Sequence, residues 1–153
     1  MTLRQNLTNL RGTGQLADHQ ASVPELRQHL EHARDQLADA RNGTVSKIGR
    51  FNAAYGASHA LLTAAIKLHG FRPTGTGHRQ TLFALADQLM PGAAAAQAVL
   101  ADAHFKRNRH EYDGAPIQVT DALLDAMVAA VTSLDEEVRL AVSAHARRQG
   151  GGV

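Results

Sequence analysis

A run of seven residues near position 110 gathers the side chains best suited to chemistry on a phosphate. It reads Arg107-Asn108-Arg109-His110-Glu111-Tyr112-Asp113. Each residue of a helix turns by about 100°, so Arg107, His110 and Glu111 share one face. Arg binds phosphate and stabilises its developing charge, and His transfers protons near neutral pH. The run predicts metal-free cleavage of RNA; the alternative is a solvated helix end with ordinary surface charges.

Asn108 and Tyr112 fall on the stripe of this helix that the periodicity predicts to be buried, together with Ala98, Ala101 and Phe105. A buried Asn must be hydrogen-bonded, so Asn108 either fixes the register of the helix or orients a site. Tyr112 either binds a ligand or closes the bundle beside Phe105. Arg109, on another face, is a candidate contact to nucleotide or RNA.

A second polar group is expected on the seam of an earlier helix. Asn52, Tyr55 and His59 follow one another at steps of three and four residues, the spacing that places them on one helical stripe. We expect at least one of them to lie within hydrogen-bonding reach of the Arg107–Tyr112 segment. The alternative is a self-contained structural network, and His59 alone is more typical of a core histidine than of a catalyst.

His78 and Arg79 open another helix after a glycine-rich loop at 74–77. A helix N-terminus attracts anions, so both are candidate contacts to a phosphate, although a simple connection is the plainer interpretation. His29 and His32 lie three residues apart, but no further ligand accompanies them, and the chain has no Cys. We therefore expect neither a metal site nor a cofactor.

The composition is typical of one helical domain. Among the 153 residues, 44% are hydrophobic and only 4% aromatic, so the core must consist of aliphatic side chains and alanine. The net charge of +2 does not by itself indicate a nucleic-acid-binding protein. No stretch approaches the roughly 20 apolar residues of a membrane span, and the start has no signal-peptide pattern. These features predict a cytoplasmic protein without membrane contact.

The apolar periodicity predicts an all-α fold without strands: a single bundle of four or five helices over residues 21–148. Residues 1–20 are expected to form an arm or a short helix, and residues 149–153 a flexible tail. Ser22, Pro24 and Glu25 mark a helix start with a capping box, and Thr120 caps the last helix. The buried stripes are expected to include Leu26, Leu30, Ala33, Leu37 and Ala40; Ile48, Leu62 and Ile66; Leu82, Leu85, Ala86 and Leu89; and Leu123, Met127, Val131, Leu134, Val138 and Val142.

Two stretches together resemble the HEPN superfamily, small helical domains of prokaryotic defence and toxin–antitoxin systems. The first runs from Arg50 to Leu62 and continues through Gly70-Phe71-Arg72-Pro73 to His78-Arg79. It is similar to the family pattern of a Tyr, a His four residues later, a Leu pair, a Gly-x-x-Pro loop and a His. The second is the Arg107–Asp113 run, which resembles the family's Arg-Asn segment ending in an acidic residue and Tyr.

The resemblance implies a homodimer in which the Arg-Asn helices of two subunits meet at a shared cleft. Active members cut RNA without metal: the ribose 2′-hydroxyl attacks the neighbouring phosphate and leaves a 2′,3′-cyclic end. By this resemblance Arg107, Asn108 and His110 are the catalytic candidates. Toxin members are controlled by a partner, so an antitoxin or a nucleotidyltransferase is an expected partner here.

The spacing of the Arg and His separates two functions. In active members four to six residues lie between the two, whereas only two separate Arg107 from His110. The leading prediction is an RNA-binding protein with metal-independent endoribonuclease activity. The alternative, which the short spacing favours, is a non-catalytic module that binds nucleotide or RNA, or regulates a partner, through the same groove. A purely structural helical dimer is a third interpretation.

Overall fold

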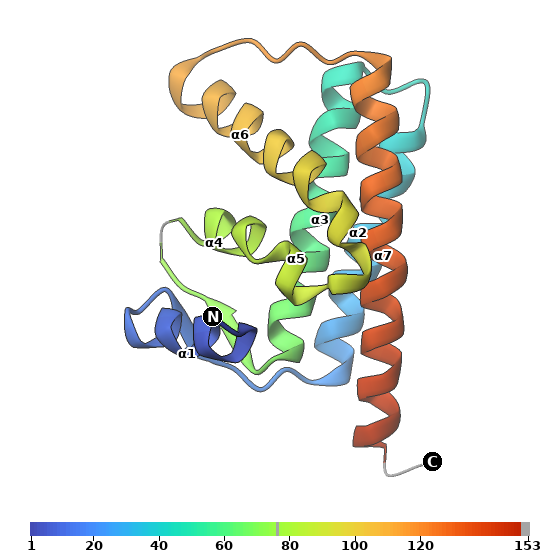
Figure 1. Ribbon diagram of the computed structural model, residues 1–153. Coiled ribbons are helices and arrows are strands. Elements are labelled where there is room, and N and C mark those ends of the chain that lie inside the picture. The colour runs from blue at the N-terminus through green and yellow to red at the C-terminus, as the bar shows by residue number, and fades with distance from the viewer. Residues whose placement is uncertain (76, 151–153) are drawn as a thin grey trace.

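Three long helices form the centre of the protein: α2 (Val23–Arg41), α3 (Lys47–Leu68) and α7 (Asp121–Gln149). The computed structural model describes residues 1–75 and 77–150, without the side chain of His78. The three helices run alongside one another, and α3 packs against both α2 and α7 (Figure 1). Because α3 is covered from several sides, most of its residues between 54 and 66 are buried.

The other elements are shorter and are placed around one side of α3. They are α1 (Leu3–Gly12), β1 (Leu16–Asp18), β2 (Phe71–Pro73), α4 (His78–Ala84), α5 (Ala86–Leu89), the 3-10 helix η1 (Pro91–Ala96) and α6 (Gln97–Asp113). The described residues thus form seven α-helices rather than four or five. The difference arises because the first 20 residues contain a helix and because the predicted helix that opens at His78 and carries the stripe from Leu82 to Leu89 is divided into α4 and α5.

The fold is mostly helical, but it also contains a small antiparallel sheet that the sequence analysis did not predict. Leu16 pairs with Pro73, and Asp18 pairs with Phe71. Each strand has only three residues, too few for an alternating pattern to be visible in the sequence. Leu16 and Phe71 are buried, so the sheet fixes the N-terminal segment against the end of α3.

The helix starts follow the capping chemistry of the sequence. The Ser22 hydroxyl accepts from the Glu25 backbone N–H at 3.2 Å, and the Thr120 hydroxyl accepts from Leu123 N–H at 3.1 Å. The predicted capping box at Ser22 is wrong, because the carboxylate of Glu25 binds Lys67 and His19 instead.

The predicted buried stripes are confirmed where the apolar residues are large and regularly spaced. All five predicted positions of α2 are buried, as are the four predicted positions of α4 and α5. In α7 the stripe from Met127 to Val142 is buried. In α3, by contrast, Ile48 and Asn52 are exposed, because the first turns of that helix bury the face that carries Phe51 and Ala54 instead.

The buried face of α6 differs from the predicted one. Leu100 and Ala103 are buried, whereas Phe105 and Tyr112 are 59% and 78% exposed. The predicted stripe consists mainly of alanines and aromatic residues. In the structure, α6 instead turns Leu100, Ala103 and His104 towards the bundle. Within the described residues, no helix has both the length and the apolar character needed to cross a membrane.

Candidate functional site

A hydrogen-bonded chain of three side chains joins α3 to α6. The hydroxyl of Tyr55 lies 3.0 Å from Nδ1 of His104, and Nδ2 of Asn108 lies 3.2 Å from Nε2 of the same ring. His104 and Asn108 are four residues apart, one turn of α6, so they face α3 together. Tyr55 is thereby linked to Asn108 through His104, whereas the expected direct hydrogen bond from the polar residues of α3 to the Arg107–Tyr112 segment stays a prediction.

The ring of His104 is held in a stack of three aromatic rings. Its centroid lies 4.9 Å from that of Phe83 in α4, with 12° between the ring planes, and Phe83 stacks in turn on Tyr55 at 5.2 Å. Burial lowers the pKa of His104, and the nearby charge of Arg79 lowers it further. A neutral ring has one donor and one acceptor, so the Asn108 amide donates to Nε2 and Nδ1–H donates to the Tyr55 oxygen.

Two arginines from different helices flank the phenol ring of Tyr55. The guanidinium carbon of Arg79 in α4 lies 6.0 Å from the ring centroid, and that of Arg107 in α6 lies 5.7 Å from it. Burial raises the pKa of Tyr55, although both positive charges act in the opposite direction. The phenol consequently remains protonated at neutral pH.

The two guanidinium groups have different partners: Arg79 contacts the Tyr55 side chain, and Arg107 pairs with a carboxylate. Nη1 of Arg107 donates to Glu111 Oε2 at 2.7 Å, an ion pair one helical turn apart. Nε of Arg79 is buried and has no hydrogen-bond partner within the described part of the chain. A buried N–H that lacks a partner is costly, so Arg79 offers a donor that a ligand can satisfy.

A hollow of about 390 Å³ opens beside these groups, between the loop that precedes α4, α4 itself and α6. Its size lies in the range of small-molecule sites. It combines a guanidinium, an imidazole, an amide and a carboxylate with two backbone positions that lack side chains. We call it the α4–α6 pocket; it is lined by Gly75, Gly77, Arg79, Gln80, His104, Asn108, Glu111 and Tyr112.

The structure brings part of the predicted site together at this pocket. Arg79, Asn108, Glu111 and Tyr112 line it. Tyr55 and Arg107 do not line the pocket but contact residues that do: Tyr55 contacts His104, and Arg107 pairs with Glu111.

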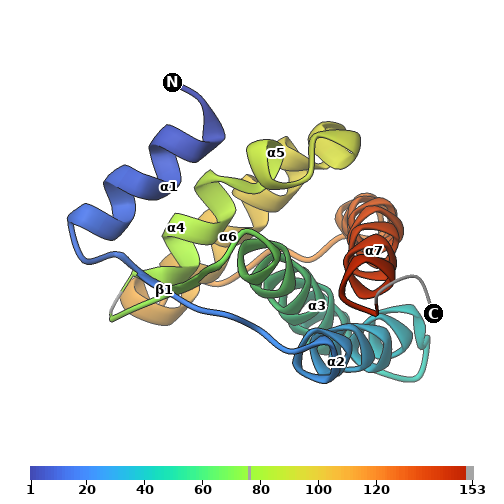
Figure 2. The same ribbon diagram turned by 90° about the horizontal axis from the view of Figure 1, so that it is seen from below.

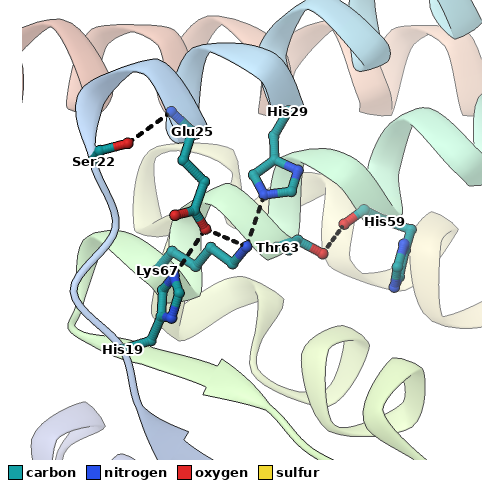
Figure 3. A network of polar contacts seen from close by, with 7 residues as sticks. All are labelled: His19, Ser22, Glu25, His29, His59, Thr63 and Lys67. Atoms are coloured by element: carbon teal, nitrogen blue, oxygen red, sulfur yellow. Dashed lines mark hydrogen bonds and ion pairs between the residues drawn. The ribbon is translucent and has the colours of Figure 1, made fainter.

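The remaining candidates are not among the residues that line the pocket. His110 is exposed, and its Nδ1 lies 3.1 Å from the carbonyl oxygen of Ala115, just beyond α6. Arg109 is exposed and lies over the Phe105 ring at 5.8 Å. Asn52 is exposed on α3, and the backbone carbonyl of His59 accepts from the Thr63 hydroxyl (Figure 3). The side chain of His78 lies outside the described part of the structure.

His104 is the functional candidate that the sequence analysis missed. It precedes Arg107 by three residues and Asn108 by four, so helical spacing alone places all three on adjacent faces. His110 lies inside the dense charged run, whereas His104 lies outside it and outside the stripe that the periodicity predicts to be buried.

A second polar cluster lies around Lys67 near the other end of α3 (Figure 3). Lys67 Nζ donates to Glu25 Oε2 at 2.6 Å and to His29 Nε2 at 3.0 Å, while His19 Nε2 lies 2.8 Å from the same carboxylate oxygen. The hydrogen bond from Lys67 lowers the pKa of Glu25. Burial, assisted by the charge of Lys67, lowers the pKa of His29, which leaves this ring neutral and able to accept. These contacts fasten α2 and the segment before it to α3.

Comparison with models of known protein families, with curated proteins and with solved structures finds no match for this chain.

Proposed function

We propose that the α4–α6 pocket binds a phosphate group and that the chain is an RNA- or nucleotide-binding protein of the HEPN type. The observation that carries this proposal is Arg79, which lines the pocket and whose buried Nε lacks a hydrogen-bond partner within the described residues. Arginine offers several N–H donors in a planar fork that matches the oxygens of a phosphate.

The other groups at the pocket suit the same ligand. The amide of Asn108 is a neutral hydrogen-bonding group, and Arg107 adds positive charge next to the lining residue Glu111. The one carboxylate that lines the pocket, Glu111, is balanced by its 2.7 Å ion pair with Arg107. A small, partly enclosed, net cationic pocket favours an anion of the size of a phosphate. The resemblance of the Arg-Asn run to HEPN proteins supports RNA or a nucleotide as the molecule that carries it.

Removing the Arg79 fork tests the proposal. We expect Arg79→Gln to weaken binding of a fluorescent single-stranded RNA roughly 10- to 100-fold, since hydrogen bonds to charged groups contribute more than neutral ones. Arg34→Gln is the matched control, because Arg34 is an exposed arginine of α2 whose side chain lies 69% exposed. Fluorescence anisotropy gives both affinities. Equal affinity of the two variants would show that Arg79 does not bind the phosphate.

A second candidate function is metal-independent cleavage of RNA. It is favoured by one feature, the neutral His104 in contact with the Tyr55 hydroxyl and close to two guanidinium groups. In such a reaction His104, rather than His110, would move the proton of the ribose 2′-hydroxyl. Both ring nitrogens of His104 are engaged, however, by Tyr55 and by Asn108. Binding without cleavage is therefore the function that the geometry supports better.

Incubation of the protein with labelled RNA in EDTA distinguishes binding from cleavage. If the protein cleaves, 2′,3′-cyclic ends form without metal, His104→Ala reduces the rate by roughly 10²–10⁴-fold, and His110→Ala leaves it nearly unchanged. If the proposed binding function holds alone, RNA remains intact with every variant while its affinity still depends on Arg79. Loss of cleavage in His110→Ala but not in His104→Ala would restore His110 as the proton carrier.

We further propose a homodimer formed through α6. Phe105 and Tyr112 are large, exposed side chains on this helix, and such residues are favoured at protein interfaces. Sedimentation at micromolar concentration is expected to show a dimer that Phe105→Ser dissociates, whereas Leu140→Ser, at an exposed leucine of α7, leaves it intact. A monomeric native protein would exclude this assembly. The antitoxin or nucleotidyltransferase partner stays a prediction of the family resemblance.

A further inference from the structure

A second and larger hollow lies on the other side of the first turn of α4. Its volume is about 700 Å³, and it opens between α1 and α4. Figure 2 shows α1 beside α4, away from α2 and α7. We call it the α1–α4 hollow; it is lined by Met1, Asn6, Asn9, Leu10, Gln15, Gly77, Gln80, Thr81, Ala84 and Leu85.

The α1–α4 hollow and the α4–α6 pocket share a wall. Gly77 and Gln80 line both of them. Arg79 lines only the α4–α6 pocket, and Thr81 lines only the α1–α4 hollow. Gly77, whose φ is +80°, contributes no side chain to this shared wall. The two spaces therefore adjoin each other at the first turn of α4.

We propose that the α1–α4 hollow receives the base of the nucleotide whose phosphate occupies the α4–α6 pocket. This inference rests on the proposed function. It adds a binding site for the base, which the phosphate site does not contact. It assigns the two halves of a nucleotide to two spaces of different chemistry, one on each side of the same helical turn.

The chemistry of the hollow is that of a neutral, planar, hydrogen-bonding group. None of the described side chains that line it carries a charge. The amides of Asn9, Gln15 and Gln80 offer both donors and acceptors, which the edge of a nucleobase can match, while Leu10 and Leu85 give apolar surface for its faces. Among the described residues that line the hollow, the only charge is the N-terminal ammonium of Met1, whereas the α4–α6 pocket is lined by the guanidinium of Arg79. We therefore assign the phosphate to the α4–α6 pocket and the base to the α1–α4 hollow.

Two contacts show how the hollow is kept open and available. Asn6 Nδ2 donates to Gln88 Oε1 at 2.7 Å, which ties α1 to α5 and sets the separation of α1 from α4. Within the described part of the chain, the Thr81 hydroxyl makes two long contacts of 3.4 Å, to Gln15 Oε1 and to the carbonyl of Gly77. Hydroxyl bonds of this length are weak, so Thr81 can turn to a ligand with little loss.

Calorimetry with inorganic phosphate, ribose 5-phosphate and the four nucleoside 5′-monophosphates tests the inference. We expect at least one nucleoside monophosphate to bind about 10-fold or more tightly than ribose 5-phosphate, a preference equivalent to about 1.4 kcal/mol. Ala84→Phe, at an exposed position that lines the hollow, should abolish this preference without changing the affinity for ribose 5-phosphate. Ala38→Phe, at an exposed position of α2, is the matched control and should leave both affinities unchanged.

Thr81→Val supplies a second test that does not depend on added bulk. The loss of one hydroxyl is expected to weaken binding of the preferred nucleotide roughly 3- to 10-fold and to leave ribose 5-phosphate unaffected. If ribose 5-phosphate binds as tightly as every nucleotide, or if Ala84→Phe leaves the preference intact, the inference is wrong while the phosphate site stands. If neither phosphate, ribose 5-phosphate nor any nucleotide binds, the proposed function and the inference are overturned together.

Discussion

Two lysine–carboxylate pairs in this protein have nearly the same length but different surroundings. Lys67 lies 2.6 Å from Glu25, with side-chain exposures of 15% and 30%. Lys106 lies 2.7 Å from Asp102, with exposures of 37% and 50%. Water screens the second pair more strongly, and an exposed pair contributes little to stability. Lys67 also contacts His29, so removal of the lysine takes a hydrogen-bond partner from two partly buried groups, the Glu25 carboxylate and the His29 ring.

The residue-scale prediction is a comparison of these two lysines. Lys67→Met should lower the free energy of unfolding by about 1–3 kcal/mol, the range for a buried polar group that loses its partner. Lys106→Met, which removes an exposed pair one helical turn apart, should change it by less than about 0.5 kcal/mol. Urea unfolding followed by circular dichroism measures both. Equal losses in the two variants would mean that burial does not distinguish the pairs.

The single helix α6 carries two surfaces of opposite character. Its inner surface places Leu100, Ala103 and His104 against the bundle, and its outer surface exposes Phe105. Tyr112 is also exposed, but it lines the α4–α6 pocket. The inner surface positions His104 and Asn108 for the site, while the outer surface remains available to a second subunit. A rotation of this helix by one residue would therefore disturb the site as well as the packing.

The element-scale prediction tests which surface of α6 faces inward. Leu100, with 1% exposure, should behave as a core residue, so Leu100→Ala is expected to cost about 2–5 kcal/mol of unfolding free energy. Phe105→Ala should cost less than about 1 kcal/mol in the monomer, because its side chain is 59% exposed and gains little from folding. Urea titration at low protein concentration measures both. A larger loss of unfolding free energy for Phe105→Ala than for Leu100→Ala would show that Phe105 faces inward, as the periodicity predicts.

The helices differ in how well the sequence predicts them, and the reason is physical. In α2 the large residues Leu26, Leu30 and Leu37 recur on one side only, so the pattern admits one buried face. In α6 alanines are distributed around the whole helix, and an alanine loses little whether it is buried or exposed. The face of α6 is therefore decided by the neighbours on α3 and α4, which no local pattern describes.

The candidate site shows the same limit. Tyr55, Arg79, Arg107 and Asn108 were each predicted from residue type and spacing. Their meeting point at His104 was not, because it depends on which face of α6 meets Tyr55 and Phe83. The three-residue strands β1 and β2 likewise arise from a pairing across more than 50 residues of chain, which a local pattern does not record.

At the scale of the whole molecule, three histidines from three regions are held in environments that disfavour their charged form. They are His29 in α2, His69 at the end of α3 and His104 in α6, and burial is the main cause of the lowered pKa in each. Neighbouring positive charges act in the same direction: Lys67 beside His29, Arg4 beside His69 and Arg79 beside His104. Glu25, near His29, acts in the opposite direction.

These histidines predict that the protein loses stability as the pH falls below about 6.5, the ordinary pKa of histidine. The unfolded chain takes up protons at that pH, whereas the folded chain resists them, so the free energy of unfolding rises with pH through this window. The lowered pKa of Glu25 extends the loss to more acidic pH, because its carboxylate stabilises the fold only while ionised.

Urea unfolding at intervals from pH 5 to pH 8 gives the free energy of unfolding at each pH. The slope of this free energy against pH gives the number of protons taken up on unfolding. Replacement of His29, His69 and His104 by Gln should flatten the slope between pH 5 and pH 6.5, whatever its effect on absolute stability. Replacement of the exposed His32 and His110 by Gln should leave the slope as in the native protein. Two outcomes would show that burial of the three histidines does not link folding to pH. One is a native protein whose unfolding free energy does not change with pH, and the other is a slope that flattens only when His32 and His110 are replaced.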